Sequence, residues 1–121
     1  MMKAGKVWGN TRGLFAGNNV EIHRIEVGAG GVCSKHKHDH KSNMFYVESG
    51  TLEVRVWKND YALVDKTMLF AGDTTIVPPG EFHQFCALTE VVAYEVYWVE
   101  LDPGDIVREN VGGQETIAAG A

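Results

Sequence analysis

The residues of this chain best suited to chemistry are four of its five histidines. His36 and His38 are two positions apart, and alternate residues of a strand point to the same side, so their imidazoles can reach one point in space. His83 follows the rigid turn Pro78-Pro79-Gly80, which can direct a later strand back to that point. The spacing predicts a metal site held by His36, His38 and His83.

Two residues beside the histidine pair are candidates for the same site. Asn43 offers a neutral carbonyl oxygen, and His40 is expected at a turn near the mouth of the site, as a further ligand or a substrate contact. Imidazoles with a neutral oxygen suit zinc, nickel or iron better than magnesium or manganese, which prefer more oxygen ligands. We therefore expect one divalent transition metal as the cofactor, with its identity open among zinc, nickel and iron.

Composition favours a small all-β protein. The chain has 121 residues, enough for a single domain spanning 1–121, and its 14 glycines suit the many tight turns of short strands. A formal net charge of −5 without a basic run argues against nucleic acid and membrane surfaces as partners. No apolar run approaches the roughly 20 residues that span a bilayer, and the first residues do not resemble a signal peptide. A cytoplasmic protein acting on a small polar molecule is expected.

Hydrophobic patterning predicts short strands at regular spacing, as in a β-barrel or sandwich. Residues 20–27 and 52–57 alternate as half-buried strands do, and residues 91–99 form the longest apolar run and should be a central strand. The core is expected over about residues 20–100. Residues 1–19 would then be an N-terminal arm, with a short edge strand and a loop near its middle, and residues 103–121 a C-terminal tail.

The register of the strand after the histidine pair decides which groups face inward. One unbroken strand from His36 to Glu48 would bury the Glu48 carboxylate, which is costly. A turn over residues 39–42 instead turns Asn43, Phe45 and Val47 inward, and we prefer this register.

Both histidine stretches resemble the motifs of the cupin superfamily. The first is Gly30, five residues, His36-x-His38, four residues, Asn43, six residues and Gly50. The second is Gly72, five residues, Pro78-x-Gly80, two residues and His83. The resemblance implies a double-stranded β-helix, or jelly-roll, barrel. It also implies one divalent metal on two histidines and a Glu of the first motif and the histidine of the second.

Within the cupins, the chain is most similar to the isomerase domain of type II mannose-6-phosphate isomerases. The similarity includes Lys6-Val7-Trp8-Gly9, the His-rich stretch, Val77 to His83, Tyr94 to Tyr97 and Asp105 to Arg108. Those isomerases carry a Glu where this chain has Asn43 and an Arg where it has Lys41. The resemblance implies chemistry on a sugar or sugar phosphate, by aldose–ketose isomerisation.

Such an isomerisation assigns roles to further residues. His40 and Glu95 are candidate bases, and Lys41 and Arg108 are candidate cations for a phosphate. For Glu95 an alternative is an outward-facing position on a strand whose other face carries Tyr94, Val96 and Trp98. Candidate substrate contacts on inward faces are Phe45 and Phe85.

Two other functions fit the same residues. Three histidines without a Glu also resemble the ligand set of non-heme iron dioxygenases, in which substrate and oxygen occupy open metal positions. The absence of both the Glu and the Arg suits a non-catalytic module that binds a small ligand. In any of these functions, aromatic residues such as Trp57 and Tyr46, together with open sheet edges, predict a homodimer formed by sheet pairing.

Overall fold

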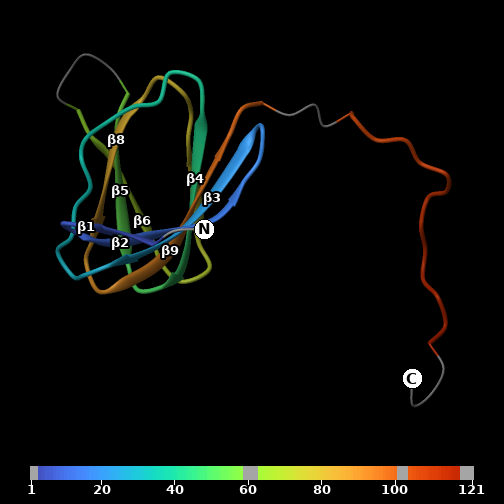
Figure 1. Ribbon diagram of the computed structural model, residues 1–121, viewed down its shortest axis with the longest axis horizontal. Helices are drawn as coiled ribbons and strands as arrows, with labels where there is room; N and C mark the ends of the chain where they lie inside the picture. Colours follow the sequence, from blue (N-terminus) through green and yellow to red (C-terminus); the bar gives the residue numbers. More distant parts are fainter. Residues whose placement is uncertain (1–2, 59–62, 101–103, 118–121) are drawn as a thin grey trace.

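Two antiparallel β-sheets face each other in the computed structural model, which describes residues 3–58, 63–100 and 104–117 (Figure 1). The larger sheet has the strand order β1-β2-β3-β9-β4-β7, and the smaller sheet has the order β6-β5-β8. The larger sheet's strands are β1 (Lys3–Lys6), β2 (Gly9–Ala16), β3 (Val20–Val27), β4 (Ser42–Ser49), β7 (Thr74–Val77) and β9 (Val91–Trp98). Those of the smaller sheet are β5 (Leu52–Trp57), β6 (Asp65–Leu69) and β8 (Phe82–Ala87). The all-β prediction is confirmed.

Strand β9 lies between β3 and β4, as expected for the longest apolar run. In β4 the buried residues are Asn43, Phe45 and Val47, so the inward register predicted for this strand is confirmed. The alternation of apolar and polar residues determined this register, because a shift of one residue would have exchanged the buried and exposed faces of the strand.

The core fills the space between the two sheets. Phe45 and Phe85 are each 1% exposed, and their ring centroids lie 6.2 Å apart in an edge-to-face arrangement. Burial of each such side chain contributes on the order of 1.5–3 kcal/mol. The rest of the buried apolar cluster is Ile25, Val27, Cys33, Val47, Leu52, Val54, Leu69, Val77, Ala87, Val91 and Ala93.

The N-terminal residues extend the larger sheet. Strand β2 pairs with β3 over its length, and β1 pairs with β2, so the segment expected as an arm contributes a hairpin to that sheet. The prediction of one short edge strand and a loop in this segment is wrong. At the other end of the chain, residues 104–117 run away from the sheets (Figure 1). In the described part of the chain, no helix is long and apolar enough to cross a membrane.

Two glycines fix the end of the sheets where β4 turns into β5. Gly50 has φ of +85°, and a Cβ placed there would lie 2.0 Å from the backbone oxygen of Glu90. Gly9 has φ of +156°, and a Cβ there would lie 1.9 Å from the backbone oxygen of Glu26. Because both obstacles are backbone atoms, neither position accepts a side chain without moving a neighbouring strand.

The segment that carries the histidine pair is the main departure from the predicted elements. Residues 28–41, the linking segment, form no regular strand: they make two isolated bridges to β8, Val32 to Cys86 and His36 to His83, and further backbone hydrogen bonds join residues 30–33 to Phe85 and Ala87. The assignment of His36 and His38 to a regular strand is therefore wrong. Their shared orientation comes from an extended chain anchored at His36.

Candidate metal centre and cavity

Three histidines converge between the linking segment and β8. Among the described residues, His36, His38 and His83 form one group whose ligand atoms all lie within 4.8 Å of one another. Their ring centroids are 4.5 Å apart for His36 and His83, 5.0 Å for His36 and His38, and 5.5 Å for His38 and His83. The structure thus brings together the three imidazoles predicted as metal ligands.

Backbone carbonyls orient two of these rings. The Nδ1 atom of His36 lies 2.8 Å from the carbonyl oxygen of Ser34, and Nδ1 of His83 lies 3.1 Å from that of Glu81. A carbonyl oxygen can only accept, so each Nδ1 donates its N–H and each Nε2 keeps a free lone pair. Metal-binding histidines are commonly held in this way, because the second hydrogen bond fixes both the tautomer and the ring orientation.

Buried polar atoms without a hydrogen-bond partner indicate whether a metal ion fits the site. In the described residues, three buried side-chain atoms have no hydrogen-bond partner: His38 Nε2, His83 Nε2 and Asn43 Oδ1. All three are potential acceptors, and an unpaired buried polar atom costs about 1–3 kcal/mol. A divalent ion would satisfy acceptors of this kind. The residues present therefore fit a mononuclear metal site.

Burial favours the neutral form of two of these imidazoles, His38 and His83. Desolvation, followed by the nearby His36 and His83 rings, lowers the pKa of His38 to about 4. Desolvation also lowers the pKa of His83, although the hydrogen bond to Glu81 opposes this. A neutral imidazole is the form that binds a metal, so the site needs little proton release near neutral pH.

Asn43 is the candidate for a fourth protein ligand. Its side chain is 1% exposed and its Nδ2 donates to the carbonyl oxygen of Met44 at 3.3 Å, which leaves Oδ1 free. We expect Asn43→Ala to weaken zinc binding about tenfold, the lower end of the loss on removing a supporting group. Competition with a chromophoric chelator measures this. Unchanged affinity in a folded variant would show that Asn43 is not a ligand.

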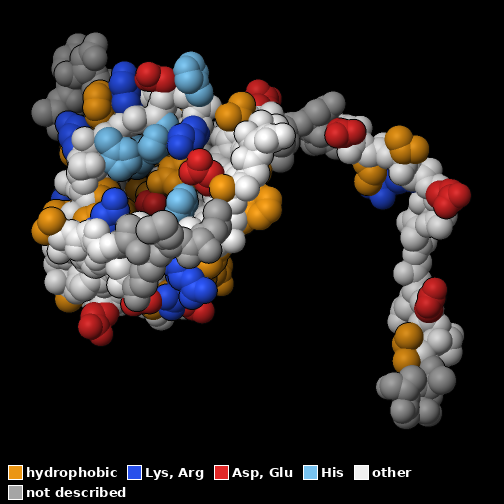
Figure 2. All heavy atoms as spheres, viewed as in Figure 1, with side chains coloured by type: hydrophobic (Ala, Val, Ile, Leu, Met, Phe, Trp, Pro, Cys, Tyr) orange, Lys and Arg blue, Asp and Glu red, His pale blue; other side chains and the backbone are white. Residues whose placement is uncertain are grey.

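A cavity of about 590 Å³ opens beside the histidines. Figure 2 shows histidine side chains gathered at a hollow on one face, with basic and acidic side chains around it. The larger sheet contributes Lys6, Thr11, Glu21, His23, Glu95 and Tyr97 to the lining, and other segments contribute Val7, Trp8, Val32, Cys33, Ser34, His36, His38, Lys41 and Phe85. The cavity therefore lies between the larger sheet and the linking segment.

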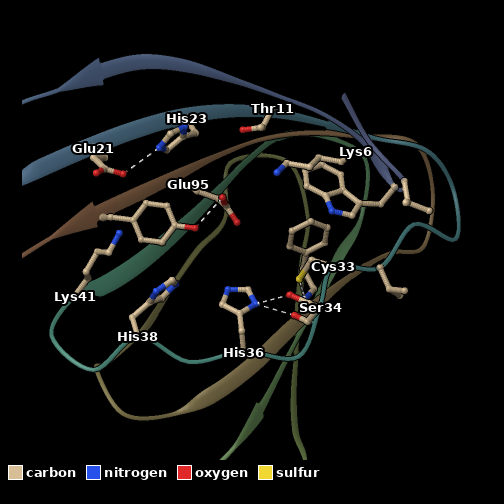
Figure 3. A pocket seen from close by; sticks show the side chains of 15 residues that line it. Lys6, Thr11, Glu21, His23, Cys33, Ser34, His36, His38, Lys41 and Glu95 are labelled. Carbon is tan, nitrogen blue, oxygen red and sulfur yellow. Dashed lines mark hydrogen bonds and ion pairs between the residues drawn. The ribbon is translucent and has the colours of Figure 1, made fainter. Parts of the chain in front are cut away.

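Glu95 faces this cavity from β9, so the outward-facing alternative is wrong (Figure 3). The Tyr97 hydroxyl donates to Glu95 Oε2 at 2.9 Å. Desolvation raises the pKa of the Glu95 carboxyl, while the bond from Tyr97 opposes the rise. Burial, together with the same carboxylate, raises the pKa of Tyr97. A carboxyl with a raised pKa in a cavity is a candidate general base.

Sequence reasoning missed a second pair on the cavity wall. His23 Nε2 lies 3.3 Å from Glu21 Oε2, and both side chains line the cavity from β3 (Figure 3). In the sheet His23 stands opposite Glu95, and Glu21 stands opposite Tyr97. In the sequence, His23 is an isolated histidine between charged neighbours. The available signal was alternation, which places Glu21 and His23 on one face of their strand but does not say what that face meets.

Two lysines bring positive charge to the cavity. The Nζ atom of Lys41 lies 5.0 Å from the ring centroid of Tyr97, a cation–π distance, and Lys6 lines the cavity from β1. The structure therefore places one predicted phosphate-binding cation, Lys41, at the site.

Other predicted residues lie elsewhere. His40 is exposed and lies outside both the three-histidine group and the cavity lining, and Arg108 is exposed in the C-terminal segment. Phe45 is buried in the core behind His83, with ring centroids 6.3 Å apart, and does not line the cavity. Phe85 does line it. Of the two predicted aromatic contacts, Phe85 is the one that a ligand could touch.

Comparison with known proteins identifies the type of domain. A family model described as a cupin domain matches residues 23–100. No curated protein of described function matches the chain.

Solved structures agree with this assignment. KdgF from Halomonas sp. has a TM-score of 0.71 at 16% sequence identity, over 84% of this chain and 90% of that one. Bacillus subtilis oxalate decarboxylase, solved in a study of its Mn(II) centres, has a TM-score of 0.72 at 16% identity, over 81% and 27% of the two chains. CapF with the inhibitor 3-isopropenyl-tropolone has a TM-score of 0.73 at 17% identity, over 84% and 31%. At these identities the likeness establishes the fold, and the predicted jelly roll is confirmed.

Proposed function

Because the chain belongs to the cupin family, we propose that it is a metal-dependent enzyme that moves a proton within a small hydroxy-carbonyl compound. The leading candidate is aldose–ketose isomerisation of a sugar or sugar phosphate. The observation that carries this proposal is that a half-buried carboxyl, Glu95, lines the same cavity as His36 and His38 of the three-histidine group.

The metal would be held by His36, His38 and His83, with Asn43 as a candidate fourth ligand. When bound, a divalent ion polarises a substrate carbonyl and its adjacent hydroxyl. All four protein donors are neutral, so the charge of the ion is not offset by a ligand carboxylate. This compensates in part for the missing Glu of the isomerase motif.

Glu95 is the proposed base. In its ionised form it takes the proton from the hydroxyl-bearing carbon next to the carbonyl, and it then returns that proton to the former carbonyl carbon, while the hydroxyl proton moves to the former carbonyl oxygen. The raised pKa of Glu95 makes its carboxylate a stronger base, which favours the first of these steps. Tyr97 orients the carboxylate through its hydrogen bond, and His23 stands beside Glu95 on the neighbouring strand.

Lys41 and Lys6 are the proposed contacts for a phosphate or another anionic group. Both line the cavity, and a lysine ammonium attracts a phosphate as a point charge. Lys41 stands where mannose-6-phosphate isomerases resembling this chain carry an Arg. The resemblance to those isomerases supports the choice of sugar phosphates as the first substrates to test.

The first experiment is elemental analysis of the purified, untagged chain, followed by a screen of aldoses and their phosphates for ketose formation. About one zinc or nickel ion per chain is expected, with turnover that is lost on chelation and restored on reloading. Iron with oxygen uptake would instead favour the three-histidine dioxygenase. The neutral set of ligands, three imidazoles without a carboxylate, is the observation that supports this second candidate. Tight ligand binding without turnover would favour a binding module. A chain that takes up none of the three metals would refute the metal-dependent proposal.

Location and assembly are also proposals. We propose a cytoplasmic homodimer formed by sheet pairing, since β1 is an edge strand of the larger sheet and Tyr46 is exposed. Trp57, expected to be exposed, is half-buried and stacks with a lysine of its own chain. Light scattering of the purified chain tests the dimer, and a monomeric mass would refute it.

A further inference from the structure

The linking segment alternates between two kinds of side chain. His36 and His38 belong to the three-histidine group, while Lys35 and Lys37 between and beside them contact two aromatic rings. The Nζ atom of Lys35 lies 4.1 Å from the ring centroid of Trp57. Neighbouring residues of an extended chain point to opposite sides, so holding the lysines on one side turns the histidines to the other.

The two rings form one surface, which we call the aromatic platform (Trp57 and Phe82). Trp57 ends β5 and Phe82 begins β8, and the two residues stand opposite each other in the smaller sheet. Lys35 Nζ is 5.7 Å from the Phe82 centroid, and Lys37 Nζ is 5.3 Å from it. These three contacts are within the range of a cation–π interaction.

Backbone hydrogen bonds fix part of the stretch that carries His36 and His38. His36 and His83 exchange two backbone hydrogen bonds, of 3.0 and 2.8 Å, and the Gly80 amide donates to the His38 carbonyl oxygen at 2.8 Å. Toward the N-terminus, residues 30–33 make three more backbone hydrogen bonds with Phe85 and Ala87, but no regular ladder continues beyond His38 in the described linking segment. Side-chain contacts of the lysines therefore have room to contribute to the orientation of the two histidines.

We propose that the aromatic platform is a positioning device for the metal centre. By holding Lys35 and Lys37 on the outer face, it keeps His36 and His38 aimed at His83. This inference rests on the metal binding of the proposed function, and it adds residues that touch neither metal nor substrate.

The proposal can be tested by the direction in which metal affinity changes when the two lysines are replaced. Two ammonium groups near a divalent cation repel it, so their removal alone would tighten metal binding. Loss of positioning would weaken it instead. The two roles of the lysines therefore predict opposite changes in affinity.

The test compares zinc affinities of the full chain and its variants by chelator competition. We expect Lys35→Met with Lys37→Met to weaken zinc binding about tenfold, as loss of supporting contacts does at metal sites. The pair Lys35→Arg with Lys37→Arg should stay within about twofold, because Arg also stacks on aromatic rings. Lys58→Met, which removes an exposed lysine paired with Asp65 at 3.5 Å, is the matched charge control. Asp39→Asn controls for the 3.8 Å contact between Lys37 and Asp39.

Amide hydrogen exchange of the metal-free chain gives a second readout. The His36 amide, which donates to His83, should exchange several-fold faster in the Met variant and at the native rate in the Arg variant. Unchanged or tighter zinc binding in the Met variant, or unchanged exchange at His36, would overturn the platform proposal alone. Native chain that takes up none of zinc, nickel and iron would overturn it together with the proposed function. Should the double Met variant not fold, Lys35→Met alone gives the same comparison.

Discussion

Replacement of His83 by alanine is expected to reduce zinc affinity by more than about a hundredfold, beyond the loss seen for supporting residues. His83 is 1% exposed, and its Nε2 has no other partner among the described residues. Among the three histidines it is the one that β8 supplies, so its loss leaves two imidazoles from the linking segment. The bound metal per chain, measured after dialysis against a competing chelator, should fall to background.

Two other histidines provide matched controls for His83→Ala. His40→Ala removes an exposed imidazole from the same stretch as His36 and His38, and His23→Ala removes one from the opposite wall of the cavity. Both variants should keep the native metal content. Equal loss in all three variants, or in none, would contradict the assignment of the three-histidine group as the metal site.

Glu95→Gln is expected to lower kcat about a thousandfold on any substrate that the chain isomerises, which is within the range for loss of a general base. Glutamine keeps the shape of the side chain and can still accept the hydrogen bond from Tyr97. Substrate binding should therefore change little, and the loss should appear in kcat rather than in KM.

The same substitution should stabilise the metal-free fold at neutral pH. Burial raises the pKa of Glu95, so between the unfolded value near 4.3 and the folded value the native state binds more protons. Stability from this group is therefore lost as pH rises through that window. Urea unfolding at pH 4.5 and pH 7.5 should show Glu95→Gln gaining over the native chain at the higher pH.

Glu90→Gln is the control for both effects. Glu90 is exposed at the far end of β9, so its replacement should leave kcat and the pH dependence of unfolding unchanged. A Glu95→Gln variant with native kcat would remove Glu95 from the reaction. Equal pH dependence in the two variants would show that the Glu95 carboxyl is not destabilised by burial.

Sequence was sufficient where one face of a strand is buried and the other is not. In β4, burial of Asn43, Phe45 and Val47 follows from alternation, because the other register would place Glu48 in the core. The convergence of His83 on His36 and His38 also followed from the motif spacing, since the turn before β8 returns the chain to the linking segment.

Sequence was insufficient where local pattern and tertiary pairing disagree. Strand β2 contains Gly9, Asn10 and Gly13, which disfavour strands, and its stability comes from pairing with β3. Glu95 could not be assigned to a face because apolar residues occupy both sides of β9, so only its pairing with β3 fixes the side. That pairing is also what places His23 beside it.

The two crowded glycines have a consequence for how ligands enter and leave. At Gly9 and Gly50 the backbone lies directly against that of a neighbouring segment. Neither glycine carries a side chain that could repack if the two segments moved apart. The histidine-bearing part of the linking segment, at the opposite end, is joined to β8 by the bridge between His36 and His83 and so has more freedom. Local opening should therefore be confined to the histidine end, and the exchange rate of a bound ion or product would be set by how often that one segment lifts from β8.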